Sequence, residues 1–195
     1  MSKIIITGIT GASGSIYALN FLKHAAASGI DLRVVITEKG ELVFKHETGM
    51  TLTDALIRLD IHERKSCSVK IYDNNDMFAD IASGSYKTDG MVVIPCSMKT
   101  LSGIANGYSS SLLERTADVM LKERRDLILA VRETPLSMIH LKNMTLAAEA
   151  GAVILPASPG FYNHPAAIDD LADFITGKIL DQLKIEHSLK TVWRP

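Results

Sequence analysis

Charged residues of both signs surround a short apolar segment in the second half of the chain. Arg115 and Lys122 are seven positions apart, so a helix would place them about two turns apart on one face. Arg132 and Glu133 follow the apolar run at 127–131 directly. A charged pair at the end of a buried strand needs a partner or a ligand. We therefore expect these cations to gather around a local anion.

The same helix allows a simpler interpretation. Glu114, Asp118 and Lys122 follow one another at intervals of four residues. On an isolated helix this spacing is typical of an exposed ladder of ion pairs with no ligand.

A glycine-rich segment, GITGASG at 8–14, follows the first predicted strand. Glycines let the backbone approach a ligand closely, and the next helix would offer free N–H groups to a phosphate. Ser13 could add a hydroxyl hydrogen bond. With Thr7, the segment also matches the TGxxGxxG spacing of nicotinamide-dependent dehydrogenases, but none of the five tyrosines has the Lys four residues later that those enzymes need. A ligand-free turn is the remaining alternative.

The segment PCSMKT at 95–100 follows the third predicted strand. Ser97 and Thr100 are expected to cap the next helix, and the same groups could hold a flavin ring or a phosphate. Cys96 could be a nucleophile, although a small buried apolar residue is the stronger interpretation. A proline-rich loop at 156–165 carries Phe161 and Tyr162, which either close over a planar ligand or cover the end of the sheet.

The composition predicts one ordered domain. The 195 residues are 47% hydrophobic and 22% charged, with a net charge of -1 and a pI of about 6.6, which argues against nucleic acid or acidic membranes as partners. The mean hydropathy of +0.15 fits either a subunit interface or a well-filled core. No apolar run is long enough for a membrane span, and no secretory signal or metal-binding spacing is recognised. The two cysteines form no CxxC, so we expect a cytoplasmic protein with reduced thiols.

Apolar runs alternate with amphipathic segments along the chain. This alternation predicts an α/β fold, a three-layer Rossmann-like (flavodoxin-like) parallel sheet with helices on both faces. Such sheets bind ligands beyond the carboxyl ends of their strands. The expected strands are 3–7, 31–36, 90–94, 127–131 and 152–155, and the expected helices are 15–28, 38–48, 52–59, 97–105, 110–125, 135–150 and 168–183, with Pro135 in the first turn of its helix.

Several of these segments together resemble one family. GITGASG, VIPCSMKTL, LLERTADVMLKERR, RETPLSMIHLKNM and PGFYNHP occur in the order found in the UbiX-like flavin prenyltransferases, long called aromatic acid decarboxylases. The resemblance implies bound FMN, no metal, and a homododecamer with active sites at subunit junctions. It also implies transfer of a dimethylallyl group from dimethylallyl monophosphate to N5 and C6 of reduced FMN. The product would serve a UbiD-type decarboxylase.

The resemblance assigns roles to individual residues. FMN would be held by Gly11, Ala12, Ser13, Thr37, Ser97, Met98, Lys99, Thr100 and Arg132. The prenyl phosphate would contact Lys122, Arg132, Tyr162 and Lys178. The catalytic set would be Ser13, Glu47, Arg115, Lys122, Glu133 and Trp193. The last of these lies in a tail at 185–195 that is expected to pack near the site or on a neighbouring subunit of this single 1–195 domain.

One position departs from the family pattern, because Lys178 stands where an arginine is usual. Lysine meets phosphate as a point charge, whereas arginine can bind it through two parallel hydrogen bonds. Two other functions remain open on the sequence alone. One is an FMN-dependent aromatic acid decarboxylase or oxidoreductase, and the other is a non-catalytic protein that binds and delivers FMN.

Overall fold

Six parallel strands form a single sheet in the computed structural model, which describes residues 2–61 and 67–189. The strand order is β3-β2-β1-β4-β5-β6. The strands are β1 (Ile4–Ile9), β2 (Asp31–Ile36), β3 (Val69–Tyr72), β4 (Gly90–Cys96), β5 (Leu127–Val131) and β6 (Val153–Ile154). Every residue of β4 and β5 is buried, as expected for central strands that are covered on both faces.

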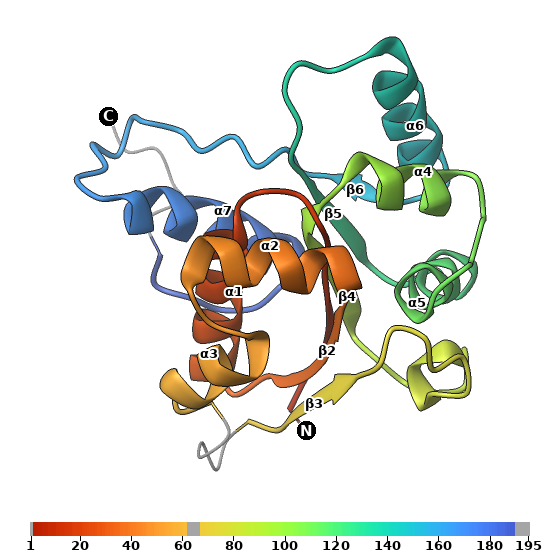
Figure 1. Cartoon of the computed structure of the whole chain (residues 1–195), viewed down its shortest axis with the longest axis horizontal. Coiled ribbons are helices and arrows are strands. Elements are labelled where there is room, and N and C mark those ends of the chain that lie inside the picture. The colour runs from red at the N-terminus through yellow and green to blue at the C-terminus, as the bar shows by residue number, and fades with distance from the viewer. Residues whose placement is uncertain (1, 62–66, 190–195) are drawn as a thin grey trace.

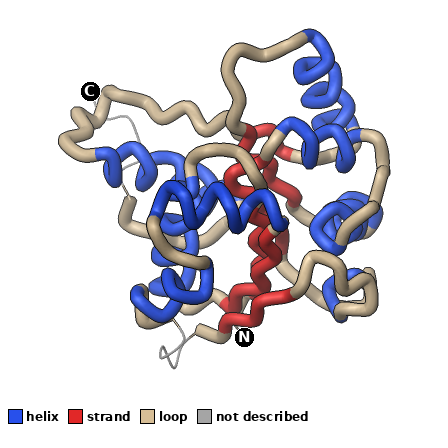
Figure 2. Tube along the Cα trace, viewed as in Figure 1, coloured by secondary structure: helices blue, strands red, loops and turns tan. Residues whose placement is uncertain are grey.

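Helices cover both faces of the sheet (Figures 1 and 2), which confirms the predicted three layers. On one face, α1 (Ser15–Ala27), α2 (Glu38–Thr48), α3 (Leu52–Arg58) and α7 (Ile168–Gln182) enclose one apolar core. On the other face, η1 (Asp80–Ala82), α4 (Met98–Ala105), α5 (Leu112–Lys122) and α6 (Met138–Glu149) enclose a second. Side chains of each strand alternate between these cores, so the sheet is hydrophobic on both sides.

The prediction of five strands was wrong by one, because it omitted β3. This strand pairs with β2 at the edge of the sheet, where Val69 is half-buried and Lys70 and Ile71 are exposed. Only Tyr72 is buried. A short edge strand with one buried side chain has too weak a pattern to be recognised among the polar residues around it.

The start of α6 also differs from the prediction. The helix begins at Met138, three residues after Pro135, and Ser137 is its N-cap. The Ser137 hydroxyl accepts the backbone N–H of His140, and the His140 ring accepts the backbone N–H of Ser137. This reciprocal cap satisfies two N–H groups at once, which explains why the helix starts here and not at the proline.

None of the helices in the described part of the chain is both long and apolar enough to cross a bilayer.

Candidate active site

The glycine-rich loop between β1 and α1 is bound by one carboxylate. Glu47, near the end of α2, accepts the backbone N–H groups of Gly14 at 3.0 Å and Ser15 at 2.7 Å. Gly14 has φ of 115°, a left-handed conformation that favours glycine. Partial burial raises the pKa of Glu47, but hydrogen bonds from the Ser13 and Ser15 hydroxyls and from the backbone outweigh it and lower the pKa to about 2. Glu47 is therefore ionised at neutral pH and holds the loop through these hydrogen bonds.

Arg132 connects the end of β5 to this loop. Its Nε donates to the backbone carbonyl of Ser13 at 3.0 Å. Its backbone N–H bonds to the carbonyl of Cys96, so β4 and β5 remain paired up to the site. The neighbouring Glu133 accepts the backbone N–H of Thr134 at 3.1 Å. The structure thus confirms that Arg132 and Glu133 stand at the carboxyl end of a fully buried strand.

Cys96 is no nucleophile at neutral pH. Its side chain is completely buried, and burial raises the pKa of the thiol to about 12. The interpretation as a small buried apolar residue is confirmed.

A cavity of about 690 Å³ lies on one side of the glycine-rich loop. Three helix N-termini border it, because Thr37, Ser97 and Ser111 cap α2, α4 and α5 and all three line the cavity. Helix N-termini carry partial positive charge and free N–H groups, so their convergence suits an anion such as phosphate. The volume lies within the roughly 300–1,000 Å³ of pockets that hold drug-sized ligands.

Most residues expected at a flavin site lie around this cavity. Gly11, Thr37, Ser97, Lys99 and Thr100 line it directly. Ala12 and Met98 are buried, and Met98 packs into the second core, so neither offers a side chain to a ligand there.

A second cavity, of about 470 Å³, lies beside the loop and Glu47. Ser13, Gly14 and Glu47 supply its polar wall, and Ile16 and Leu19 of α1 are among its apolar residues. The glycine-rich loop therefore contributes to two neighbouring cavities, one bordered by three helix N-termini and the other partly apolar.

Several residues around the larger cavity were missed by the sequence analysis. They share a position at a strand end or a helix start and comprise Ile36, Glu38, Lys39, Glu41, Tyr72, Asp73, Asn74, Asn75, Ser111, Leu113 and Glu114. Residues 73–75 follow the omitted strand β3, so recognising that strand would have found them. Ser111 begins a Ser-x-x-Glu pattern, which is a sequence signal for a helix start.

Arg115 and Lys122 line neither of these two cavities. Arg115 donates to the backbone carbonyl of Ala82 at 3.2 Å and pairs with Asp118. Lys122 pairs with Glu123 at the end of α5, before β5 begins. Lys122 therefore sits at the amino ends of the strands, whereas the cavities sit at the carboxyl ends. The expected gathering of these cations with Arg132 does not occur within one chain.

The alternative of an exposed ion-pair ladder on α5 was also wrong. Glu114 is buried and pairs with Lys99 of α4. Asp118 pairs with Arg115, three residues before it. Equal spacing along a helix did not predict these pairs, because the partner of Glu114 comes from a different helix.

The remaining predicted residues lie around α7. Tyr162 packs edge-on against Phe174, with ring centroids 5.7 Å apart. Lys178 lies over the same Phe174 ring at 5.8 Å and is 4.0 Å from Asp181. Phe161 is exposed. Trp193 lies outside the described residues.

Within residues 2–61 and 67–189, no group of three or more His, Cys, Asp or Glu side chains is arranged to hold a metal ion.

Fold and site together define a flavin-binding α/β protein. The Flavoprotein family matches residues 1–180, and the chain belongs to it. More narrowly, it belongs to the UbiX-like flavin prenyltransferases. It is 50% identical to flavin prenyltransferase UbiX of Halalkalibacterium halodurans, over 97% of this chain and 93% of the relative. It is 46% identical to the enzyme of the same name from Methanothermobacter thermautotrophicus, over 98% and 95% of the two chains.

Solved structures agree with this assignment. A UbiX protein solved with FMN and dimethylallyl pyrophosphate, AnUbiX, superposes with a TM-score of 0.92 at 38% identity, over 100% of this chain and 99% of that one. A dodecameric FMN-dependent UbiX-like decarboxylase from Escherichia coli O157:H7 superposes with a TM-score of 0.88 at 37% identity, over 98% and 99%.

Proposed function

We propose that this protein is a flavin prenyltransferase that joins the dimethylallyl group of dimethylallyl monophosphate to N5 and C6 of reduced FMN. The observation that carries the proposal is the pair of cavities that border the glycine-rich loop. One is suited to the anionic end of a flavin nucleotide, and the other brings Ser13 and Glu47 next to apolar side chains. Family membership supplies the reaction that these two spaces serve.

The larger cavity fits FMN by its chemistry. The N-termini of α2, α4 and α5 would face the phosphate, and Thr37, Ser97 and Thr100 would add hydroxyl groups. Reduced FMN supplies nucleophilic ring atoms when it is bound. Gly11 lets the loop approach a neighbour closely, since a Cβ there would lie 2.8 Å from Cβ of Lys39.

The two candidate carboxylates have different roles in this proposal. Glu47 has a pKa of about 2 and accepts two backbone N–H groups, so it stays ionised and orients the loop that carries Ser13. Glu133 lies beside Arg132 at the end of β5 and moves the proton that is released when the ring closes at C6. Arg132 and Lys178 stabilise the departing phosphate, because charge develops on it as the allylic bond breaks.

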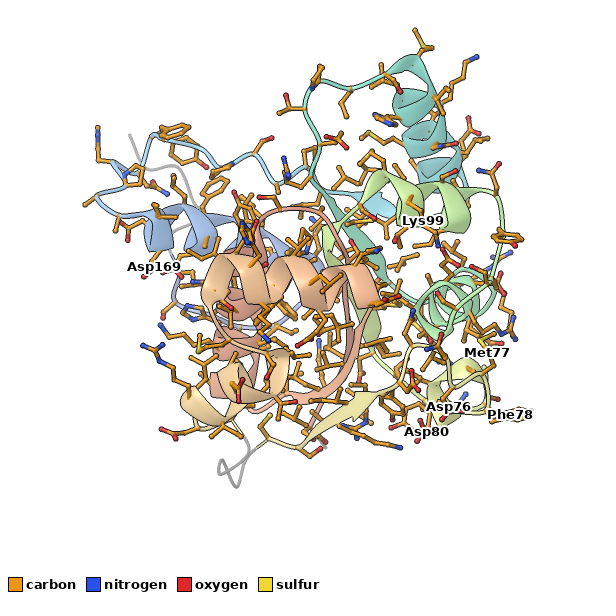
Figure 3. The ribbon with its side chains drawn as sticks, viewed as in Figure 1. Asp76, Met77, Phe78, Asp80, Lys99 and Asp169 are labelled. Carbon is orange, nitrogen blue, oxygen red and sulfur yellow. The ribbon has the colours of Figure 1, made fainter. Side chains whose placement is uncertain are left out.

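Arg115 and Lys122 reach the active site of another subunit in this account. Within one chain they lie beside η1 and at the opposite end of the sheet. We therefore propose a homododecamer, the state named for the E. coli neighbour. Exposed apolar side chains support a subunit interface, namely Phe78, which is fully exposed at the edge of the molecule (Figure 3), and Met138 and Ile139 on α6.

We further propose one domain over residues 1–195, a cytoplasmic location, and delivery of the prenylated flavin to a UbiD-type decarboxylase. The described end of the tail supports the first point, since Ile185 and Leu189 pack against the core formed by α1 and α7. Cys67 and Cys96 are both buried, which suits thiols in a reducing compartment.

A coupled assay tests the function. The protein is incubated without oxygen with FMN, a reductant and dimethylallyl monophosphate, and the filtrate is added to a UbiD-type apo-decarboxylase. We expect decarboxylation only when all three small molecules were present. A filtrate that activates equally well without the prenyl donor would favour an FMN delivery protein. Release of CO2 from an aromatic acid by this protein alone would favour the decarboxylase.

A further inference from the structure

We propose that Glu114 is a positioning residue of the cofactor site, which holds the Lys99 ammonium at the wall of the larger cavity so that it meets the phosphate of FMN. The identity of the phosphate rests on the proposed function. The pairing itself rests on the contacts of α4 and α5 alone.

The contact joins a buried carboxylate to an ammonium group that is open to solvent. Glu114 Oε1 lies 2.6 Å from Lys99 Nζ, and the side chains are 2% and 73% exposed. Both residues line the cavity. Lys99 emerges from α4 on the side that faces α5 (Figure 3). The exposed ammonium of Lys99 is therefore accessible to a ligand in the cavity, whereas the Glu114 carboxylate is not.

The Glu114 carboxylate is fully compensated and stays charged. Its second oxygen accepts the Ser110 backbone N–H at 3.1 Å and the Ser110 hydroxyl at 2.6 Å. Burial raises the pKa of this carboxyl, but the bonds from Lys99 and Ser110 outweigh that effect and lower it. Its position in the first turn of α5 also favours an anion. The Glu114 carboxylate therefore places a fixed negative charge beside the position that the Lys99 ammonium occupies.

The neighbouring helix leaves room for this carboxylate. A Cβ on Gly103 of α4 would lie 2.6 Å from Glu114 Oε1, too close for any carbon to remain there without a shift. Gly103 thus leaves space for the Glu114 carboxylate, and Ser110 and Lys99 both bond to it. Such agreement among three residues indicates that the place of the carboxylate matters, and not merely its presence.

Lys99 gains a defined position from this contact. A free lysine side chain samples many rotamers, and ordering it on binding a ligand costs conformational entropy. An ammonium has three N–H donors, so the bond to Glu114 leaves two for an anion. Because Lys99 is already held when the phosphate arrives, less entropy is lost on binding.

Titration of FMN and riboflavin into the full-length protein tests this role, because riboflavin lacks the phosphate. We expect Glu114→Gln to weaken FMN binding by about three- to tenfold and to leave riboflavin binding unchanged. Lys99→Met should produce the same selective loss. Unchanged or tighter FMN binding, or equal weakening of FMN and riboflavin, would overturn the proposal.

Two further variants separate positioning from folding. Adding Glu114→Gln to Lys99→Met should cause no further loss of FMN affinity, since Glu114 acts through Lys99. Gly103→Ala keeps every charge, yet it should displace the Glu114 carboxylate and weaken FMN binding, while unchanged riboflavin binding shows that the fold is intact. Additive losses in the double variant, or full FMN affinity in Gly103→Ala, would contradict the role. These binding readouts do not depend on prenyl transfer, so they distinguish a failure of this inference from a failure of the proposed function.

Discussion

Arg132 donates its Nε–H to the backbone carbonyl of Ser13, 119 residues earlier in the chain, at 3.0 Å. The bond crosses the end of β4, because β1 and β5 lie on either side of that strand. One side chain thereby fixes the glycine-rich loop relative to the end of β5, which Glu133 follows. The guanidinium has five donors, so four remain after this contact for a ligand.

Arg132→Lys should weaken the binding of both FMN and the prenyl donor, although it keeps the positive charge. Lysine has no planar fork, so it cannot bond the Ser13 carbonyl and a phosphate in the same geometry. We expect FMN affinity to fall by about tenfold and the KM for the prenyl donor to rise. Fluorescence titration and initial rates measure the two effects. Wild-type values for both would show that the bond to Ser13 has no part in ligand binding.

Glu133→Gln should separate chemistry from binding. The amide has the same shape but cannot take up a proton at C6, so we expect kcat to fall by about 100-fold or more while FMN binding is retained. Single-turnover rates with FMN bound measure the step directly. Wild-type rates in this variant would remove Glu133 from proton transfer.

Glu47→Gln should change stability in a pH-dependent way. The folded-state pKa of about 2 lies below the ordinary value of 4.5, so the ionised form stabilises the fold. That contribution is fully present above about pH 4.5 and is lost as the pH falls through about 2. The difference in melting temperature between wild type and Glu47→Gln should thus be constant from pH 6 to 8 and shrink toward pH 3. A difference that grows on acidification would contradict the assigned contacts.

Much of the fold followed from the sequence because its strong signals are local. The runs in β4 and β5 are apolar at nearly every position, and Ser97 caps α4 as expected. Thr100, the other expected cap, lies inside α4 and donates its backbone N–H to Ser97. The edge strand β3 and the cap at Ser137 depend on weaker signals and were missed.

The site was harder to predict than the fold, because its contacts join distant segments. Nothing in the spacing of Glu114 indicated Lys99 as its partner. The position of Lys122 could have been inferred. A residue just before a parallel strand lies at the amino ends of the strands, and one just after it lies at the carboxyl ends. Lys122 and Arg132 therefore could not form one cluster within a single chain.

Lys122→Met and Glu47→Gln should complement each other in mixed oligomers. Each variant alone is expected to lose most prenyl transfer. If Lys122 serves a neighbouring subunit, co-assembly in equal amounts should leave about a quarter of the sites with both native residues. Activity of the co-expressed mixture, compared with the two proteins combined after purification, measures this. Activity no higher than that of the separate variants would show that Lys122 and Glu47 of one active site do not come from different subunits.

Lys178→Arg tests the departure from the family pattern. Arginine can bind phosphate through two hydrogen bonds, so we expect the KM for the prenyl donor to fall several-fold with FMN affinity unchanged. Lys178→Met is the matched control and should raise that KM. Equal KM values in all three proteins would show that this position does not contact the prenyl phosphate.

The mass of the flavin after reaction tests the central claim most directly. Wild-type protein, reduced FMN and dimethylallyl monophosphate are incubated without oxygen, and the flavin is extracted and weighed by mass spectrometry, with Glu133→Gln as the matched control. The account predicts a flavin that is heavier by one dimethylallyl unit in the wild-type reaction and mostly unchanged FMN in the variant. Unmodified FMN after prolonged incubation with the wild-type protein would contradict it.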